Sequence, residues 1–227
     1  MISVLIPIIG FGQRIGFDEI DNSKVAPWIV ELSSEYQCVY HFGDSEMESD
    51  FILIIENDRC CAQIKNGNWT LDGKKWIIHY ENLINVRIEG NLFFSDKTNG
   101  EFVLYDNGKE KIKGLKVFNS WSGLTQNGEY EIGTKSYPVA DYFSGKFIQA
   151  SLRQLNSEEL RKMSKSDLKL MRNEIYARYG FIFKSGGEME LYFKKQEWYL
   201  ALYNNVDNFL TEIEKENIKL IQKLESK

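Results

Sequence analysis

The side chains best suited to ligand chemistry lie in the last third of this 227-residue chain: Arg172, Tyr176, Arg178, Trp198 and Tyr199. Together they would give an exposed surface of arginines and aromatic rings. Such a surface suits sugar rings through stacking and carboxylates through the bidentate guanidinium fork. The alternative is a purely structural role, because arginines can bridge helices, and tyrosine and tryptophan can pack in the core while their polar atom forms a hydrogen bond. The five are therefore candidate binding residues, and none is assigned a catalytic role.

No catalytic motif accompanies these residues. The sequence has no nucleophile elbow, phosphate-binding loop or zinc-protease pattern, so it predicts no cofactor. His41 and His79 each lie inside a strand pattern without metal-ligand spacing, and no metal site is predicted from them.

One acidic loop leaves a metal alternative open. Residues 44–50 place carboxylates at alternate positions, as calcium loops do, but Ser49 and Ile55 stand where the helix-loop-helix motif needs glycine and glutamate. The open alternatives are a looser calcium site and a solvated hairpin tip.

Helical periodicity must position the candidate binding residues. From Ser151 onward the apolar spacing is helical, and residues 149–227 are predicted to form a small three-helix domain. In its longest helix Leu168, Met171, Ile175 and Tyr179 share one face, as expected of a helix that buries an apolar stripe. On the same helix Glu174 and Arg178 have the spacing of an ion pair.

The same segment carries a family resemblance. Residues 176–180 run Tyr-Ala-Arg-Tyr-Gly, after Arg-Asn-Glu-Ile at 172–175, and they are followed by Phe183, Tyr192, Phe193, Trp198, Tyr199, Glu214, Asn217 and Ile221. On these residues the segment 151–225 resembles the YARHG domain, a bacterial module named for a Tyr-Ala-Arg-His-Gly run. The resemblance implies an extracellular or envelope-associated module without an assigned enzymatic activity. Tyr179 stands where the family name has histidine, so no proton-transfer or metal role of that histidine applies here.

The N-terminal half has the pattern of a sheet. Short alternating or apolar runs recur about every ten residues, separated by Asn-Gly and Asp-Gly turns, which predicts an antiparallel β meander over residues 28–148 that closes as a barrel or a sandwich. Residues 13–27 are expected to be a linker or edge segment. The whole chain is therefore an α+β protein. Its sheet interior is expected to be filled by the chain's own aromatic side chains, the alternative being a cavity for a small apolar ligand.

The first twelve residues resemble a shortened signal peptide. An apolar run precedes Gly10, Phe11 and Gly12, a small-x-small pattern that signal peptidase accepts, although no basic segment comes first. The alternative is a first buried strand, which Pro7 disfavours. The run is too short to span a bilayer. We therefore expect an exported protein, periplasmic or extracellular, with no transmembrane segment.

Charge and cysteine content limit the partners and the covalent chemistry. The net charge is −5, divided as −7 over residues 1–150 and +2 over residues 151–227, which is too little positive charge to predict a nucleic-acid partner. The three cysteines, Cys38, Cys60 and Cys61, allow at most one disulfide bond, because adjacent residues of a strand point to opposite faces. Such a bond requires the two strands to pair, and half-buried free thiols are the alternative.

Three functions remain. The first is a noncatalytic envelope protein that binds cell-wall glycan, peptide or another envelope protein. The second is an enzyme that acts on envelope glycan, which requires two carboxylates about 5 to 10 Å apart in a cleft. The third is a carrier of a small apolar ligand, which requires a cavity of several hundred Å³ inside the sheet.

Overall fold

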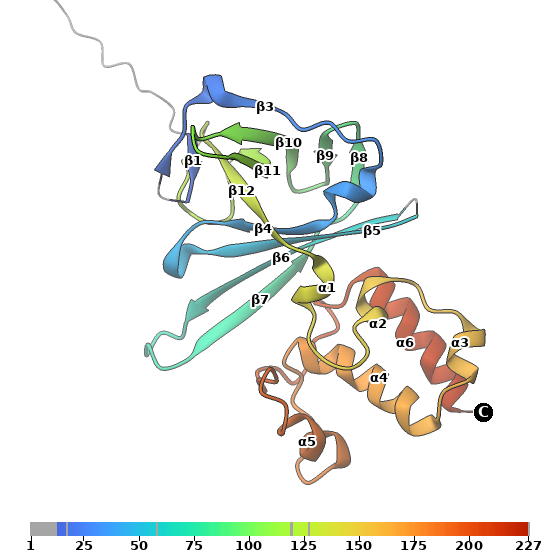
Figure 1. Cartoon of the computed structure of the whole chain (residues 1–227). Helices are drawn as coiled ribbons and strands as arrows, with labels where there is room; N and C mark the ends of the chain where they lie inside the picture. Colours follow the sequence, from blue (N-terminus) through green and yellow to red (C-terminus); the bar gives the residue numbers. More distant parts are fainter. Residues whose placement is uncertain (1–12, 17, 58, 119, 127, 227) are drawn as a thin grey trace, which may run out of the picture.

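The computed structural model describes residues 13–226 except 17, 58, 119 and 127. The signal-like leader predicted for residues 1–12 lies outside this range. The described chain divides into a sheet, built from residues 13–137, and a set of helices that begins at residue 139 (Figure 1). This arrangement confirms the predicted α+β class.

All twelve strands of the described chain belong to one sheet, in which nine follow the order β7-β6-β5-β4-β12-β11-β10-β9-β8 with antiparallel neighbours. The predicted linker or edge segment contributes three short strands, of which β1 pairs with β12 and β2 while β3 pairs with β10. The sheet curls, so that β8 lies against β6. The strands are β1 (Gln13–Ile15), β2 (Asp18–Glu19), β3 (Val25–Pro27), β4 (Cys38–Phe42), β5 (Ser49–Glu56), β6 (Arg59–Trp69), β7 (Trp76–Asn82), β8 (Arg87–Glu89), β9 (Leu92–Phe94), β10 (Asn99–Asp106), β11 (Lys111–Phe118) and β12 (Tyr130–Tyr137).

Aromatic rings fill the inside of the curled sheet. Tyr36, Tyr40, Phe51, Phe93 and Phe102 are each no more than 1% exposed. The rings of Tyr36 and Phe102 stack with centroids 3.9 Å apart, and Phe51 meets Phe93 edge to face at 5.2 Å. These rings occupy the place where a carrier of a small apolar ligand would need its cavity.

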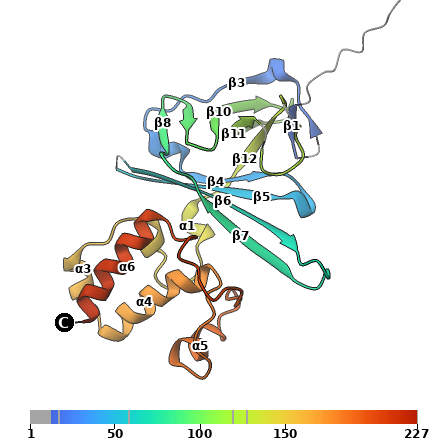
Figure 2. The ribbon, with the colours of Figure 1, turned by 180° about the vertical axis from the view of Figure 1, so that it is seen from behind.

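The outer face of β4 and β5 is also buried, because the helices cover it. Val39, Ile52 and Ile54 pack there against Val139 and Ile213. Figures 1 and 2 show the helices gathered against this side of the sheet, beyond β4 to β7. Burial on both faces explains why β5 has a continuous apolar run instead of the alternation of a half-exposed strand.

The described chain has six α-helices, of which α4, α5 and α6 correspond to the three predicted ones. Helix α4 packs on α6. Ser164 caps α4 by accepting from the Asp167 N–H, and Thr211 caps α6 in a reciprocal pair with Glu214. None of the described helices is long and apolar enough to cross a membrane. The helices are α1 (Val139–Tyr142), α2 (Gln149–Leu152), α3 (Ser157–Arg161), α4 (Lys165–Arg178), α5 (Glu188–Phe193) and α6 (Glu212–Glu225).

All three cysteines are free thiols. Strand β5 lies between β4, which carries Cys38, and β6, which carries Cys60 and Cys61, so the strand pairing that a disulfide requires does not occur. Burial raises the pKa of each of the three thiols, which keeps them protonated and unreactive.

Close packing at Gly133 gives a test of the sheet core. A Cβ at this position of β12 would lie 2.1 Å from the buried ring of Phe42. We expect Gly133→Ala to lower the free energy of unfolding by about 1 to 3 kcal/mol, measured by urea titration, because the ring has no room to move. Ser136→Ala, at an exposed position of the same strand, is the control. Equal denaturation midpoints for the two variants would contradict this packing.

Candidate functional site

Arg178, at the end of α4, is the centre of a buried polar cluster. Its side chain is only 5% exposed. Its Nε donates to the Ser144 carbonyl oxygen at 2.8 Å, its Nη1 donates to the Ser151 hydroxyl at 2.8 Å, and its Nη2 donates to Glu174 at 2.5 Å. The guanidinium therefore joins α4 to the chain on both sides of residue 147.

Glu174 completes this attachment one turn earlier on α4. Its carboxylate accepts from the backbone N–H of Phe147 at 2.6 Å and of Lys146 at 2.8 Å. Gly145 has a φ of +112°, and a Cβ there would fall 2.3 Å from the Glu174 carboxyl carbon. The loop thus wraps around the carboxylate at a position that only glycine accommodates.

Helix α6 supplies the second buried carboxyl group, Glu214, which is fully buried. It accepts from the Tyr179 hydroxyl at 2.7 Å, from the Thr211 N–H at 2.9 Å and from the Ser151 hydroxyl. Because Ser151 also accepts from Arg178, a continuous hydrogen-bond chain runs from α4 through α2 to α6.

Asn217 extends the cluster along α6. It donates to the carbonyl oxygens of Ala150 at 2.9 Å and Arg153 at 2.8 Å, and it accepts from the Leu155 N–H at 2.8 Å. It therefore provides hydrogen-bond partners for backbone groups around α2, which are buried beneath α6 and need partners within the protein.

The cluster has two carboxyl groups, Glu174 and Glu214, for one guanidinium. Burial raises the pKa of Glu214 above its ordinary value of 4.5, although its hydrogen bonds and Arg178 act in the opposite direction. Burial also lowers the pKa of Arg178, against the effect of the two carboxylates. The excess negative charge is thus relieved most easily by a proton on Glu214.

Removal of Arg178 should leave Glu174 buried without its counterion. We expect Arg178→Met to lower the free energy of unfolding by about 3 to 5 kcal/mol. Adding Glu174→Gln should recover part of that loss, because no unpaired buried carboxylate then remains. Denaturant titration of both variants checks this, with the exposed Arg161→Met as control. A single-variant loss as small as that of the control would contradict the central role of Arg178.

Glu214 should give the fold a distinctive pH dependence. Its pKa in the folded protein is raised, so the contribution of its neutral form is complete below the ordinary pKa of 4.5 and is lost as the pH rises through the folded-state pKa. The stability of the wild type relative to Glu214→Gln should therefore fall as the pH rises above 4.5, by at most about 1.4 kcal/mol per pH unit.

Urea titrations between pH 4 and pH 8 measure this difference. Glu212→Gln removes a carboxyl from the exposed first turn of the same helix and controls for the change in net charge. A wild-type advantage over Glu214→Gln that stays constant or grows with pH would contradict the raised pKa.

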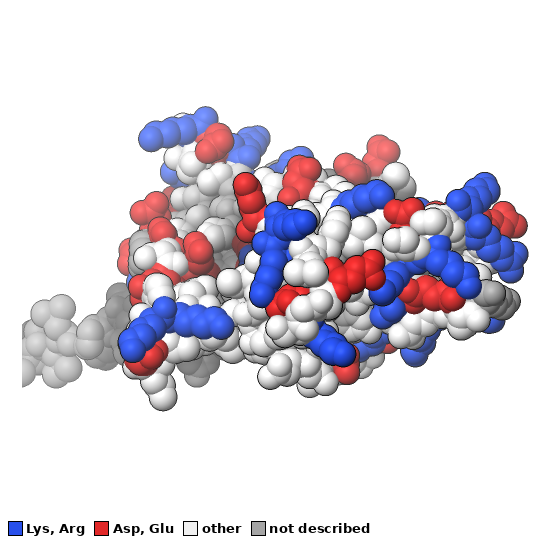
Figure 3. All heavy atoms as spheres, turned by 90° about the horizontal axis from the view of Figure 1, so that it is seen from below, with Lys and Arg blue, Asp and Glu red and all other residues white. Residues whose placement is uncertain are grey.

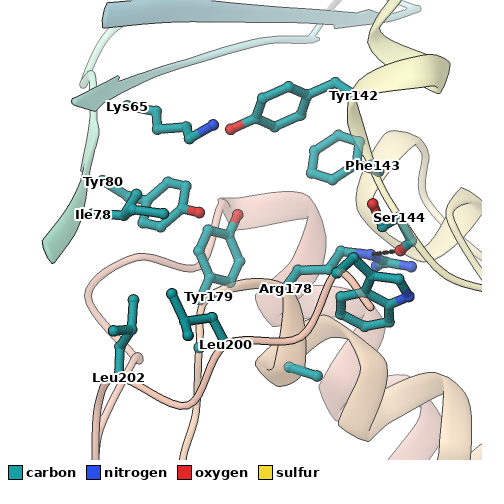
Figure 4. Close-up of a pocket in the computed structure, with 13 residues that line it drawn as sticks. Lys65, Ile78, Tyr80, Tyr142, Phe143, Ser144, Arg178, Tyr179, Leu200 and Leu202 are labelled. Carbon is teal, nitrogen blue, oxygen red and sulfur yellow. Dashed lines mark hydrogen bonds between the residues drawn. The ribbon is translucent and has the colours of Figure 1, made fainter. Parts of the chain in front are cut away.

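Beside this cluster lies a cavity of about 190 Å³ between the sheet and the helices. It is bounded by β6 and β7 on one side, by residues 142–144 on another, and by the end of α4 and residues 198–202 on the third (Figure 4). Its lining residues are Lys65, Ile78, Tyr80, Tyr142, Phe143, Ser144, Ala177, Arg178, Tyr179, Gly180, Trp198, Leu200 and Leu202.

A second cavity of about 110 Å³ adjoins the first, and the two share Lys65 and Ile78. Trp76 forms one wall, with its indole lying over Gly67, where a Cβ would come within 2.4 Å of the ring. Glu48 and Asp50 also line this cavity. Asp50 lies 3.1 Å from His41, and its hydrogen bond raises the pKa of that histidine. We call the two cavities together the interdomain groove, because the larger one lies between the sheet and the helices; the smaller one is lined by the sheet region alone.

The structure brings two of the five candidate residues to the groove, Arg178 and Trp198. The other three are half-buried and contact other parts of the protein. Arg172 pairs with Glu225 at 2.7 Å. The Tyr176 ring packs on Phe181, and the Tyr199 hydroxyl donates to the Phe181 carbonyl at 2.6 Å. The five therefore do not form the exposed surface expected of them, because α4 turns its arginines and Tyr176 toward neighbouring elements.

The acidic loop brings two of its carboxylates to His41, Asp50 at 3.1 Å and Glu48 at 3.9 Å. Asp50 faces His41 and Lys65, whereas Glu46 accepts from the Trp69 indole at 3.0 Å. Within the described residues no group of three or more His, Cys, Asp and Glu side chains is placed to hold a metal ion. On the face seen in Figure 3 basic and acidic side chains are interspersed, as the sequence composition predicts.

Sequence reasoning missed several residues of the site. Glu214 and Asn217 were named only for the family resemblance and not as site residues, although polar residues among the apolar positions of α6 were a usable signal. Lys65 and Tyr142 gave no such signal, because they lie far apart in the chain and meet only when the helices pack on the sheet.

Comparison with known proteins supports the C-terminal interpretation. Residues 144–226 match the YARHG domain, which confirms the resemblance of the C-terminal third. The match begins at residue 144, whose carbonyl oxygen accepts from Arg178. Neither the curated proteins nor the solved structures gave a match to the chain.

Proposed function

We propose that this protein is an exported protein of the bacterial envelope that binds cell-wall glycan or peptide in the interdomain groove without cleaving it. The observation that carries the proposal is the groove itself. Its larger cavity lies between the sheet and the YARHG segment and has aromatic walls and basic side chains, and its smaller cavity continues along the sheet past Lys65, Glu48 and Asp50. Sites for small ligands favour such positions between structural units, where a few polar groups orient the ligand within an apolar lining.

The groove is suited to a sugar or peptide unit. Tyr80, Tyr142, Trp198 and Trp76 give it aromatic surface from the sheet, from α1 and from the loop after α5. Aromatic rings bury a large apolar area and keep a polar atom for hydrogen bonding, which matches ligands that have both apolar faces and hydroxyl or amide groups.

The lining of the larger cavity favours binding over cleavage. Among the residues that the structure describes, no aspartate or glutamate lines it. Glu48 and Asp50 line the adjoining cavity, where Asp50 is paired with His41 and Lys65. Glu174 and Glu214 lie nearby but are buried and committed to hydrogen bonds with the protein. A glycan-cleaving site needs carboxyl groups that reach the scissile bond.

The candidate binding residues divide between two roles under this proposal. Trp198 contacts the ligand, and Arg178 positions the wall beside it through its bonds to Ser144 and Ser151. Arg172, Tyr176 and Tyr199 act indirectly, by holding α4, α5 and the loop at residues 198–202 in place. Export is supported by the signal-like first twelve residues and by the envelope association that the YARHG resemblance implies.

Co-sedimentation with purified cell wall tests the proposal. Wild-type protein should appear in the pellet, and Trp198→Ala should bind about tenfold more weakly because the groove loses an aromatic wall, a change equivalent to about 1.4 kcal/mol. Phe118→Ala removes an exposed ring from β11, outside the groove, and should bind as the wild type does. Thermal unfolding of each variant establishes that it is folded.

Either of two results would contradict the proposed function. The first is a wild-type protein that stays in the supernatant. The second is a folded Trp198→Ala variant that sediments as well as the wild type. Release of soluble wall fragments during incubation would instead support the glycan-acting enzyme.

A further inference from the structure

We infer that the interdomain groove is a carboxylate-binding site, in which the Lys65 ammonium and the hydroxyls of Tyr80 and Tyr142 hold a free carboxylate of the ligand. The inference rests on the proposed function and specifies the chemistry that the site recognises.

The two tyrosine hydroxyls are the first observation. Both tyrosines line the cavity, and neither hydroxyl has a hydrogen-bond partner among the described residues. Two other tyrosine hydroxyls near the groove are committed, since Tyr179 donates to Glu214 and Tyr203 to the Ile78 carbonyl. The Ser49 hydroxyl, which lines the adjoining cavity, is buried without a partner among the described residues. Neither hydroxyl oxygen of the two cavity tyrosines is among the fully buried side-chain atoms that lack a partner, so both hydroxyls are open to the cavity and can donate to a ligand there.

Lys65 is the second observation. Its ammonium enters the cavity from β6 and lies 5.3 Å from the centre of the Tyr142 ring (Figure 4). Its one ion-pair partner in the described chain is Asp50, at the long distance of 3.6 Å, and His41 shares that carboxylate at 3.1 Å. The ammonium is therefore incompletely neutralised and can accept a second anion.

The charge that remains available in the larger cavity is positive. Lys65 and Arg178 are the charged residues that line it, and Arg178 is already paired with Glu174, so Lys65 is the group left for an anion. Glu48 and Asp50 line the adjoining cavity. Burial raises the pKa of both tyrosines, so their hydroxyls stay neutral and donate. One ammonium and two phenol donors match the several lone pairs of a carboxylate.

The size of the site limits how much of the ligand it encloses. A volume of about 190 Å³ equals that of about six water molecules, so it holds one terminal unit. The adjoining cavity, reached past Lys65, gives space for a neighbouring unit. The carboxylate belongs either to the end of a peptide or to an acidic sugar, and the two sources share the same recognition chemistry.

Titration calorimetry on the full chain separates these sources. The probes are N-acetyl-alanyl-alanine and N-acetylmuramic acid, each compared with its amide, in which the carboxylate is replaced by a neutral group of similar shape. At least one acid should bind, and about tenfold more tightly than its amide. Which of the two acids binds identifies the source. Equal affinity of acid and amide in both pairs, or no binding by either acid, overturns the inference.

Two variants test the residues. Lys65→Met keeps the apolar stem and should weaken binding of the acid about tenfold while leaving the amide unchanged. Tyr142→Phe keeps the aromatic ring but removes the hydroxyl, and it should weaken binding of the acid several-fold. Lys75→Met changes an exposed lysine just before β7 that does not line the groove, and it is the matched control. Unchanged acid binding in a folded Lys65→Met variant contradicts the assignment, and Tyr142→Phe gives the same test if Lys65→Met does not fold.

The two proposals fail separately. Wall co-sedimentation without any difference between acid and amide overturns the carboxylate site and leaves the wall-binding function intact. Carboxylate binding without co-sedimentation overturns the wall-binding function and leaves the carboxylate site intact.

Discussion

The buried guanidinium of Arg178 is the constraint on which the helical part of this protein depends. A charge at 5% exposure is stable only when its hydrogen bonds are satisfied, and three separate segments satisfy it: Ser144, Ser151 and Glu174. Each segment is held by further contacts, because Glu174 binds the backbone of residues 146 and 147 and Ser151 donates to Glu214. The arginine thus fixes how α2, α4 and α6 meet.

The same polar core shapes the groove. Arg178 and Tyr179 both line the cavity. Their polar atoms are hydrogen-bonded to other residues of the protein, as the Tyr179 hydroxyl is to Glu214, so this wall is fixed in place although it contains polar side chains. The motif that identifies the YARHG domain therefore has a structural role that can be stated atom by atom. Tyrosine at position 179 fits that role, since its hydroxyl donates to Glu214 and its ring packs on Tyr80 of the sheet.

Prediction from the sequence succeeded where local pattern and burial coincide. The apolar stripe of α4 at Leu168, Met171, Ile175 and Tyr179 is buried as its spacing predicts. Prediction from the sequence was wrong about how exposed Arg172 and Arg178 are, because arginines look like surface residues in a sequence pattern. Whether an arginine is buried depends on partners such as Glu225 and Ser144, which are distant in sequence and whose approach no periodicity encodes.

The α+β class, the succession of strands and then helices, and the YARHG segment could all be predicted from the sequence, because hydrophobic period, turn residues and a local motif are properties of neighbouring residues. Two features follow from the tertiary structure alone: β5 separates Cys38 from Cys60 and Cys61, and Lys65 meets Tyr142 across a groove. These features arise from contacts between segments far apart in the chain. Such contacts are selected by the packing of the whole core, so the binding site exists only once the helices have docked on the sheet.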